Sequence, residues 1–569
     1  MNKKRVLYQA REYRDIRELV SDAVKTYPNN IAFIIKEKKE EVTYKNITYK
    51  MLQEDINKLG TALIDLGLKD KKIAIISNNR YEWCLAYLAT LCGVGIVVPL
   101  DKSLPAGEIE SLIKRSYANA VIFEDKYSDI MEEIKNNSQN DVEEYICMDK
   151  ENKYGFMSIE DLLDRGEKLL QNNDTRFENA TINPEVMNII LFTSGTTSAS
   201  KAVMLSQKNI VSNIHSLNSI IKVYETDRNL AFLPLHHTFG STGLLFFISN
   251  GVTNVFCDGL KYIQKNLQEY HVTIFVTVPL LLEAMNKKIL KEIDKQGKTK
   301  LIKIATKVSN FLLKFGIDIR RKLFKDIINN LGGLRMAVSG AAAIDKTVVE
   351  NFTNFGIKTV QGYGLTETSP VITAENDENI RYGSVGFPLK NEEIKIFEPN
   401  EQGIGEIIAK GPNVMLGYFE NEEATNEVLV NGWFHTGDLG YIDKDGFLFI
   451  TGRKKNVIVM KNGKNIYPEE LEVLISKLPY VAENMVFGIP TKEDDLDLAA
   501  KIVYNKEYVE EISEEELKEK IWADIKKINR TMPPYKYIRE IIVTDEPMIK
   551  TTTQKVKRFE EIKKILQEK

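Results

Sequence analysis

Cysteine is scarce in this chain: four residues among 569, well separated and without a C-x-x-C pair. A zinc site or a disulfide framework needs closely spaced or paired cysteines, so neither is predicted. Isolated free thiols are typical of a reducing cytosol. The N-terminal MNKKRVLYQAREYRD carries early positive charge but lacks the apolar segment of a secretory signal. We therefore expect a cytoplasmic protein.

An excess of charge of one sign is also missing. The 77 Lys and Arg nearly balance the 81 Asp and Glu, and the net charge is -4. This predicts no general attraction for nucleic acid. One uncharged segment of 18 residues, 83–100, contains Gly93, Gly95 and Pro99. These residues favour a buried helix followed by a buried strand over a membrane span.

Short apolar runs alternate with segments of helical length from about residue 30 to 390. The runs are IAFII, KIAIIS, GIVVPL, AVIFE, NIILF, NLAFLPL, TNVFC, TIFVTV, LRMAVSG and KTVQGYG. This alternation predicts an α/β fold, with parallel sheets covered by helices on both faces. After residue 391 the pattern changes to hairpins, with Asp445-Gly446 in one predicted turn.

The chain is too long for one hydrophobic core. We expect a large N-terminal domain over 1–452, with α/β layers and a small β-barrel-like part. A smaller, mobile α+β domain is expected over 453–569.

Residues 191–205, LFTSGTTSASKAVML, predict a phosphate-binding loop. A turn rich in Thr, Ser and Gly at the end of a strand can direct N–H groups and hydroxyls at phosphate oxygens, and Lys201 adds a point charge. The P-loop of nucleotide triphosphatases does not fit, because Ser200 replaces its second glycine and Ala202 its metal-binding hydroxyl.

Two further glycine-punctuated blocks carry candidate ligands. In QGYGLTETSP, Tyr363 offers a stacking face and Glu367 a carboxylate for magnesium. In the block from Gly432 to Glu472, Asp438 is a candidate to bind ribose hydroxyls. Arg453 is a candidate to hold the Asp438 carboxylate in position for that contact.

These three blocks, in this order and spacing, resemble those of the acyl-adenylate-forming superfamily of AMP-binding enzymes, over nearly the whole chain. PLHHTFG (234–240), GGLRMAVSGAAAID (332–345) and the basic insert before the latter are most similar to bacterial long-chain fatty acid CoA ligases. The resemblance implies ATP- and Mg²⁺-dependent activation of a medium- to long-chain fatty acid to acyl-AMP. Transfer to coenzyme A would then give acyl-CoA, AMP and pyrophosphate.

The resemblance also implies a role for each matching residue. The phosphate loop would comprise Thr193, Ser194, Gly195, Thr196, Thr197 and Lys201, and the adenine pocket Gly340, Ala341, Ala342, Gly362 and Tyr363. Thr366 would contact the α-phosphate, Glu367 the magnesium, Asp438 and Arg453 the ribose, and His237 the acyl carboxylate. Lys555 would be the catalytic lysine, Lys455 the hinge and Gly463 a pantetheine contact.

The match has departures and leaves alternatives open. Gln554 stands where the family ending has Gly, and Ser198, Ser200 and Ala202 replace the usual Gly, Pro and Gly, which predicts a stiffer loop and leaves the rate open while keeping the reaction class. The acceptor is alternatively an acyl carrier protein. The acid is alternatively an amino or aryl acid, although 236–243 contains no Asp and GSTGLLFF suggests an apolar tunnel. A non-catalytic nucleotide-binding regulator is the remaining alternative.

Residues 287–325 carry thirteen Lys and Arg. Within them, Leu301, Ile304, Val308, Phe311 and Phe315 recur at helical spacing. We expect a surface helix whose apolar stripe packs on the protein's own sheet. The alternative is a helix lying on the inner, anionic face of the membrane, which would make the protein peripheral.

Overall fold

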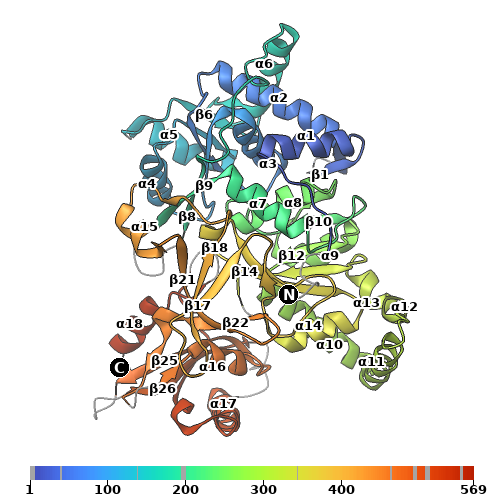
Figure 1. Cartoon of the computed structure of the whole chain (residues 1–569), viewed down its shortest axis with the longest axis vertical. Helices are drawn as coiled ribbons and strands as arrows, with labels where there is room; N and C mark the ends of the chain where they lie inside the picture. The colour runs from blue at the N-terminus through green and yellow to red at the C-terminus, as the bar shows by residue number, and fades with distance from the viewer. Residues whose placement is uncertain are drawn as a thin grey trace. The chain divides into compact units, whose positions relative to one another are not determined.

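The computed structural model (Figure 1) describes residues 7–38, 41–137, 139–193, 200–342, 344–461, 464–490, 496–506, 513–550 and 555–568. The chain divides into two compact units. The first comprises 1–193, 201–394 and 409–434, and the second 194–200, 395–408 and 435–569. The domain boundary predicted between 452 and 453 stays a prediction.

An eight-stranded sheet in the first unit has the order β19-β9-β8-β4-β3-β5-β6-β7. Its parallel strands are β3 (Lys72–Ile76), β4 (Ile96–Pro99), β5 (Ala120–Phe123), β6 (Glu144–Cys147), β7 (Met157–Ser158) and β8 (Met187–Thr193). Antiparallel β9 (Lys201–Ser206) and β19 (Gly417–Tyr418) complete one edge.

A nine-stranded sheet in the same unit has the order β16-β15-β14-β13-β12-β10-β11-β1-β2. Its strands are β1 (Ile31–Lys38), β2 (Val42–Thr48), β10 (Arg228–Ala231), β11 (Thr253–Phe256), β12 (Ile274–Thr277), β13 (Met336–Ser339), β14 (Lys358–Gly364), β15 (Val371–Ala374) and β16 (Phe387–Pro388). All ten predicted apolar runs are strands of these two sheets, and neighbours from β14 to β1 run parallel.

Helices cover both faces of each sheet, as predicted. Inner faces of the two sheets share one core with α1 (Ile16–Thr26), α2 (Tyr49–Asp65), α3 (Tyr81–Ala89), α7 (Gln207–Asn218) and α8 (Thr238–Ile248). The outer face of the eight-stranded sheet packs on α4 (Ala106–Ser116) and α5 (Ser128–Asn137). The outer face of the nine-stranded sheet packs on α9 (Ile263–Glu269), α10 (Pro279–Lys295) and α14 (Lys346–Asn354). The remaining helices of the unit include α6 (Ile159–Gln171) and α15 (Glu422–Val428).

The uncharged segment 83–100 is a buried helix followed by a buried strand, as predicted. Helix α3 continues into a π-helical turn, Thr90–Val94, before β4. Gly95 permits that sharp exit, because a Cβ there would lie 2.2 Å from the carbonyl oxygen of Lys71. Among the described helices, none is long and apolar enough to cross a bilayer.

Hairpins follow residue 391, as predicted. A five-stranded sheet contains β17 (Glu393–Phe397), β18 (Gly405–Lys410), β20 (Leu429–Val430), β21 (Trp433–Ile442) and β22 (Leu448–Arg453). Between β21 and β22, Oδ1 of Asp443 accepts the backbone N–H groups of Asp445 and Phe447, and Gly446 has φ +88°. These bonds form the predicted Asp-Gly turn.

The C-terminal part of the second unit is a small α+β layer. Strands β25 (Val481–Pro490), β26 (Leu496–Tyr504) and β27 (Ile538–Thr544) form its sheet, and β23 (Ile458–Val459) pairs with β24 (Asn465–Ile466). One face of the three-stranded sheet packs on α16 (Pro468–Ile475) and α17 (Glu514–Asn529), and the other on α18 (Arg558–Glu568).

The basic insert corrects one prediction. It folds as the end of α10, then α11 (Thr299–Leu313), α12 (Arg320–Leu323) and α13 (Lys325–Asn330). The apolar stripe does not pack on the sheet: Leu301, Ile304 and Phe311 are each about 60% exposed, and Val308 and Phe315 are also exposed. Instead Ser309, on another side of α11, is fully buried. Periodicity located the stripe correctly, but the helix packs through a different side, where Ile302, Ala305 and Leu312 are half-buried beside Ser309.

All four cysteines are free. Cys84, Cys92 and Cys147 are buried, and Cys257 is half-buried. Burial raises the pKa of each thiol, to about 12 for Cys92 and about 11 for Cys147.

Candidate active site

The predicted phosphate loop connects two antiparallel strands. Thr193 ends β8, Lys201 begins β9, and the two residues lie directly opposite each other. The Thr193 hydroxyl donates to the Lys201 carbonyl at 3.3 Å. Ser194, Gly195, Thr196 and Thr197 lie outside the described residues. The described ends of the loop thus meet at one edge of the sheet.

Tyr418 joins the predicted lysine and carboxylate. Its hydroxyl donates to Oε1 of Glu367 at 2.9 Å, and Nζ of Lys201 lies 4.6 Å from the centre of its ring. The short strand β19 holds Tyr418 against β9, where Tyr418 is opposite Val203. Desolvation and the Glu367 charge raise the pKa of the buried Tyr418 hydroxyl, so this hydroxyl stays a donor. Tyr418 was not among the residues predicted from the sequence motifs.

The turn that carries Thr366 and Glu367 is built around a close backbone approach. Residues Thr366–Thr368 form a single 3-10 turn after β14. At Gly364 a Cβ would lie 1.7 Å from the carbonyl oxygen of Pro370, so any other residue would displace the turn. The Thr368 hydroxyl donates to the same carbonyl at 2.6 Å. This packing fixes the backbone from which Glu367 projects.

The predicted adenine contacts follow two adjacent parallel strands. Gly340, Ala341 and Ala342 follow β13, and Gly362 and Tyr363 lie near the end of β14. Ser339 pairs with Gln361, so both groups lie at the same sheet edge, where ligands bind in open α/β sheets. Ala341 and Ala342 are exposed, whereas Tyr363 is buried.

His237 is the residue before α8 and is half-buried. Its ring lies 4.4 Å from that of His236, centre to centre, and Nε2 of His236 lies 3.5 Å from Oδ1 of Asp101. Burial and the neighbouring His237 lower the pKa of His236 to about 3, so its ring is neutral at physiological pH. Asp101 was not expected here, because it lies 135 positions earlier in the chain.

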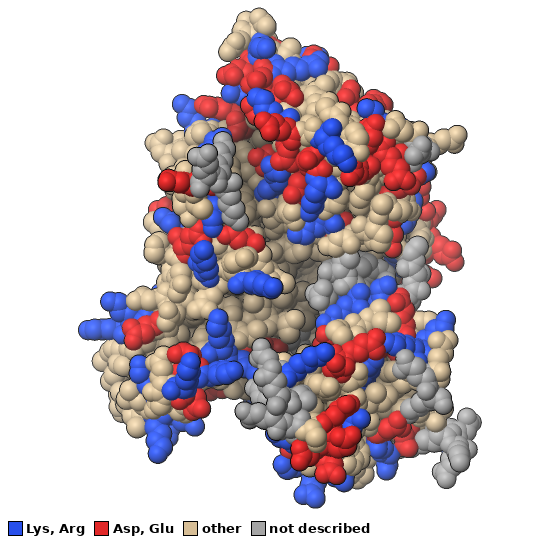
Figure 2. All heavy atoms as spheres, turned by 180° about the vertical axis from the view of Figure 1, so that it is seen from behind, with Lys and Arg blue, Asp and Glu red and all other residues tan. Residues whose placement is uncertain are grey.

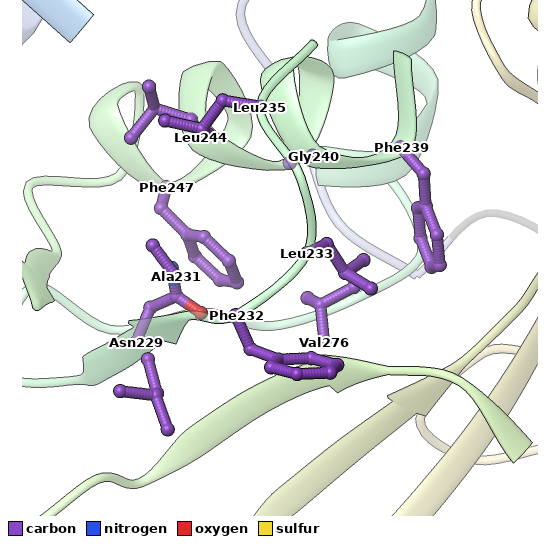
Figure 3. Close-up of a pocket in the computed structure, with 12 residues that line it drawn as sticks. Asn229, Ala231, Phe232, Leu233, Leu235, Phe239, Gly240, Leu244, Phe247 and Val276 are labelled. Atoms are coloured by element: carbon purple, nitrogen blue, oxygen red, sulfur yellow. The ribbon is translucent and has the colours of Figure 1, made fainter. Parts of the chain in front are cut away.

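A small apolar cavity of about 20 Å³ lies between α8 and the nine-stranded sheet (Figure 3). Gly240, Gly243, Leu244 and Phe247 of α8 contribute one wall, so GSTGLLFF does line an apolar space. The opposite wall comprises residues from β10 and its following loop, together with Val276 of β12. Phe239, also in the wall, would meet a Cβ at Gly340 at 2.9 Å. The cavity therefore adjoins the predicted adenine contacts.

Asp438 and Arg453 lie opposite each other on β21 and β22. Nε of Arg453 lies 2.8 Å from Oδ1 of the buried Asp438. Nearby, Glu406 accepts from Nζ of Lys454 at 3.0 Å and from the backbone N–H of Gly437 at 3.1 Å. These contacts fix both strands at the point where the pair forms.

Lys455 and Lys555 interact electrostatically within the second unit. Partial desolvation of the exposed Lys455 side chain, then the charges of Arg453 and Lys555, lower the pKa of Lys455. Lys550, the last described residue before Lys555, is held by Glu483, whose Oε1 lies 2.6 Å from Nζ of Lys550. Gly463 lies outside the described residues. Thus Asp438, Arg453, Lys455 and Lys555, distant in sequence, form one group in this unit.

Comparisons with known proteins agree with these motifs. Residues 20–419 match the model of the AMP-binding enzyme family, and residues 455–567 match the AMP-binding enzyme C-terminal domain. The chain belongs to the AMP-binding enzyme family. This confirms the resemblance to acyl-adenylate-forming enzymes and the predicted class of enzyme, an acyl-adenylate-forming ligase.

Two relatives and one solved structure illustrate the similarity of this AMP-binding enzyme. The mouse long-chain-fatty-acid–CoA ligase 5 is 30% identical over 580 residues, covering 92% of this chain and 83% of the relative. An Arabidopsis thaliana chloroplastic long-chain-fatty-acid–[acyl-carrier-protein] ligase is 25% identical over 592 residues, covering 90% and 80%. The anthranilate CoA ligase AuaEII with anthranoyl-AMP has a TM-score of 0.76 at 21% identity, covering 98% of each chain, which confirms the predicted fold class.

Proposed function

We propose that this AMP-binding enzyme joins ATP and a medium- to long-chain fatty acid to form acyl-AMP, and then transfers the acyl group to coenzyme A. The apolar side chains around the small cavity beside Gly340 carry this proposal, because they suit contact with an alkyl chain. The mouse relative, whose name specifies long-chain fatty acids and coenzyme A, supports the same acid and acceptor.

In the first step an oxygen of the fatty acid carboxylate attacks the α-phosphorus of ATP, and the bond to pyrophosphate breaks. Negative charge builds on pyrophosphate, and Lys201 stabilises it as a preorganised cation. The Tyr418 ring packs against Lys201 and restricts its position. Thr366 contacts the α-phosphate, and Lys555 aligns the carboxylate with it. Asp438, oriented by Arg453, binds the ribose hydroxyls.

The residues near Glu367 fit a magnesium ion. Glu367 is half-buried, and its Oε1 accepts one hydrogen bond from Tyr418, so the second oxygen is available for a hard cation. A bound magnesium ion would neutralise charge on the ATP phosphates. Tyr418 fixes the rotamer of Glu367 and so the direction in which the carboxylate binds.

In the second step the thiol of coenzyme A attacks the carbonyl carbon of acyl-AMP, and AMP leaves. We propose that residues 453–569 rotate between the two steps, with the pivot at Lys455, so that Lys555 withdraws. Lys455 lies in an exposed 3-10 turn directly after β22, where a backbone rotation disturbs no core contact. Gly463 then contacts the pantetheine.

The deciding experiment measures pyrophosphate release across unbranched acids from acetate to palmitate, with and without coenzyme A. We expect the rate to rise with chain length and AMP release to require coenzyme A. A maximum at acetate, or a higher rate with benzoate or anthranilate, would contradict the fatty acid assignment.

A second candidate acceptor is an acyl carrier protein, and the Arabidopsis relative favours it by name. Coenzyme A and a phosphopantetheinylated carrier protein, supplied side by side with the same acid, separate the two. Thioester formation on the carrier alone would replace coenzyme A in the proposal. Absence of pyrophosphate release with every acid would instead favour a non-catalytic nucleotide-binding regulator.

A further inference from the structure

Helix α11 presents its apolar side to solvent. At 100° per residue, Leu301, Ile304, Val308 and Phe311 fall within an arc of about 80°. Phe315 follows the helix and packs edge-on against Phe311 at 5.2 Å between ring centres. We call these five residues the α11 face. All five are exposed, so together they form a contiguous apolar surface.

The opposite side of α11 attaches it to the protein. Ser309 is buried and donates to the Thr306 carbonyl at 3.0 Å. Asn310 donates to Asn354 of α14 at 2.9 Å. A helix that folds only to fill a core buries its apolar side. On α11 the packed side carries half-buried Ile302, Ala305 and Leu312 beside Ser309, while the five residues of the α11 face stay exposed and are positioned for an external surface.

Lysines follow one border of the α11 face. On the helix, Lys300, Lys303 and Lys307 fall next to the apolar arc, and Lys314 follows the last turn. All four are exposed, and in the part of the chain that the structure describes none of them forms an ion pair. Over 287–325 thirteen basic residues stand against three acidic ones. Figure 2 shows Lys and Arg side chains around the tan surface at the lower left, where this segment lies.

The charge pattern indicates which kind of partner binds the α11 face. Helix α11 contains no Asp or Glu, so an isologous contact between two copies would offer these lysines no opposite charge. A bilayer with anionic headgroups accepts apolar side chains at the acyl boundary and ammonium groups at the phosphates. We propose that the α11 face docks on an anionic lipid surface, with Phe311 and Phe315 inserted.

The surface adjoins the segment that leaves the apolar cavity. Val276 of β12 lines that cavity, and α10 begins three residues later at Pro279. Helix α11 follows α10 after three residues, 296–298. Docking of the α11 face therefore holds α10, the helix that begins next to the cavity wall, close to the lipid surface.

Co-sedimentation of the whole protein with phosphatidylglycerol or phosphatidylcholine vesicles tests the proposal. We expect binding to the anionic vesicles only, with release as salt rises, because salt screens the attraction. Changing Lys303, Lys307 and Lys314 to Glu should lower the partition coefficient by about a hundredfold. The matched control changes Lys25, Lys50 and Lys168 to Glu, which alters net charge equally at exposed sites on α1, α2 and α6.

A second variant separates insertion from charge attraction. Phe311→Ser with Phe315→Ser keeps every lysine, and we expect it to lose at least tenfold in binding to anionic vesicles while its melting temperature stays unchanged. Equal binding by wild type and both variants, or binding by none, would overturn the proposal. A lipid-free dimer in sedimentation velocity that Phe311→Ser dissociates would also overturn it, in favour of a second copy.

Discussion

The Tyr418 hydroxyl donates to Glu367 at 2.9 Å while the ring of the same tyrosine contacts Lys201. One side chain thus positions an anionic and a cationic group that are 166 residues apart in sequence. In the proposed mechanism Lys201 contacts the phosphates and Glu367 would hold the magnesium ion, and Tyr418 sets the geometry between these two residues.

Glu367→Ala should raise the barrier to adenylation by about 2–4 kcal/mol, since it removes a preorganised charge from the phosphate site. Tyr418→Phe should be milder, lowering kcat about tenfold at saturating MgATP by leaving Glu367 unrestrained. Pyrophosphate release measures both. Tyr117→Phe is the control, because it removes a comparable but exposed bond to Glu420. An unchanged rate in Glu367→Ala would make this residue a structural acid.

Lys555→Ala should lower acyl-AMP formation at least a hundredfold and largely spare thioester formation from preformed acyl-AMP, because the lysine acts in only one of the two steps. The two half reactions are measured separately by pyrophosphate release and by AMP release. Lys563→Ala, at an exposed position of α18, is the control. Equal loss in both half reactions would contradict the role.

Lys455→Pro should produce the opposite pattern, since proline fixes φ at the proposed pivot. Adenylation should continue, and acyl-AMP should accumulate on the enzyme while thioester formation falls at least tenfold. Lys455→Ala removes the same charge and leaves φ free, so it should retain both steps. Normal transfer to coenzyme A in the proline variant would place the pivot elsewhere.

Gly243→Phe should shorten the accepted acid. A Cβ at Gly243 meets no atom within 4 Å, and the residue lines the cavity, so a phenyl ring would occupy space intended for the alkyl chain. We expect palmitate activity to fall at least tenfold while butyrate activity is retained. Gly107→Phe, also in open space but on α4, should leave the profile unchanged. A uniform loss for all acids would show that the cavity does not receive the chain.

Glu392 should make stability depend on pH. Burial raises the pKa of its carboxyl from 4.5 to about 9, and Oε2 has no hydrogen-bond partner within the described chain. Between these two pH values the folded state keeps a proton that the unfolded state has lost. The free energy of unfolding therefore falls as pH rises, by up to about 6 kcal/mol.

Glu392→Gln should remove this slope, measured by denaturant unfolding at several pH values between 5 and 9. The exposed neighbour provides the control, since Glu393→Gln should keep the wild-type slope. Parallel slopes for wild type and Glu392→Gln would show that Glu392 is ionised in the folded state.

Local sequence predicted most strands, whereas the roles of the site residues stay predictions. Short apolar runs flanked by helical segments identify buried parallel strands reliably, because few other structures bury such a run. Asp438 and Arg453, which the sequence marked as one site, form an ion pair in the structure. Tyr418 and Asp101 escaped prediction, because only tertiary contact brings them to Glu367 and His236. The α11 stripe shows a different limit: periodicity marks which residues share a side, but packing through Ser309 decides which side meets water.

The burial of three of the four thiols has a practical consequence for enzymology. Thiolates, not thiols, react with disulfide dyes, and at neutral pH the raised pKa values keep Cys84, Cys92 and Cys147 protonated as well as inaccessible. A colorimetric reagent for free sulfhydryls, added to the folded protein, will therefore record the depletion of the acceptor thiol. The background signal from the protein will be no larger than that of one thiol, Cys257. Turnover can then be followed without first mutating cysteines.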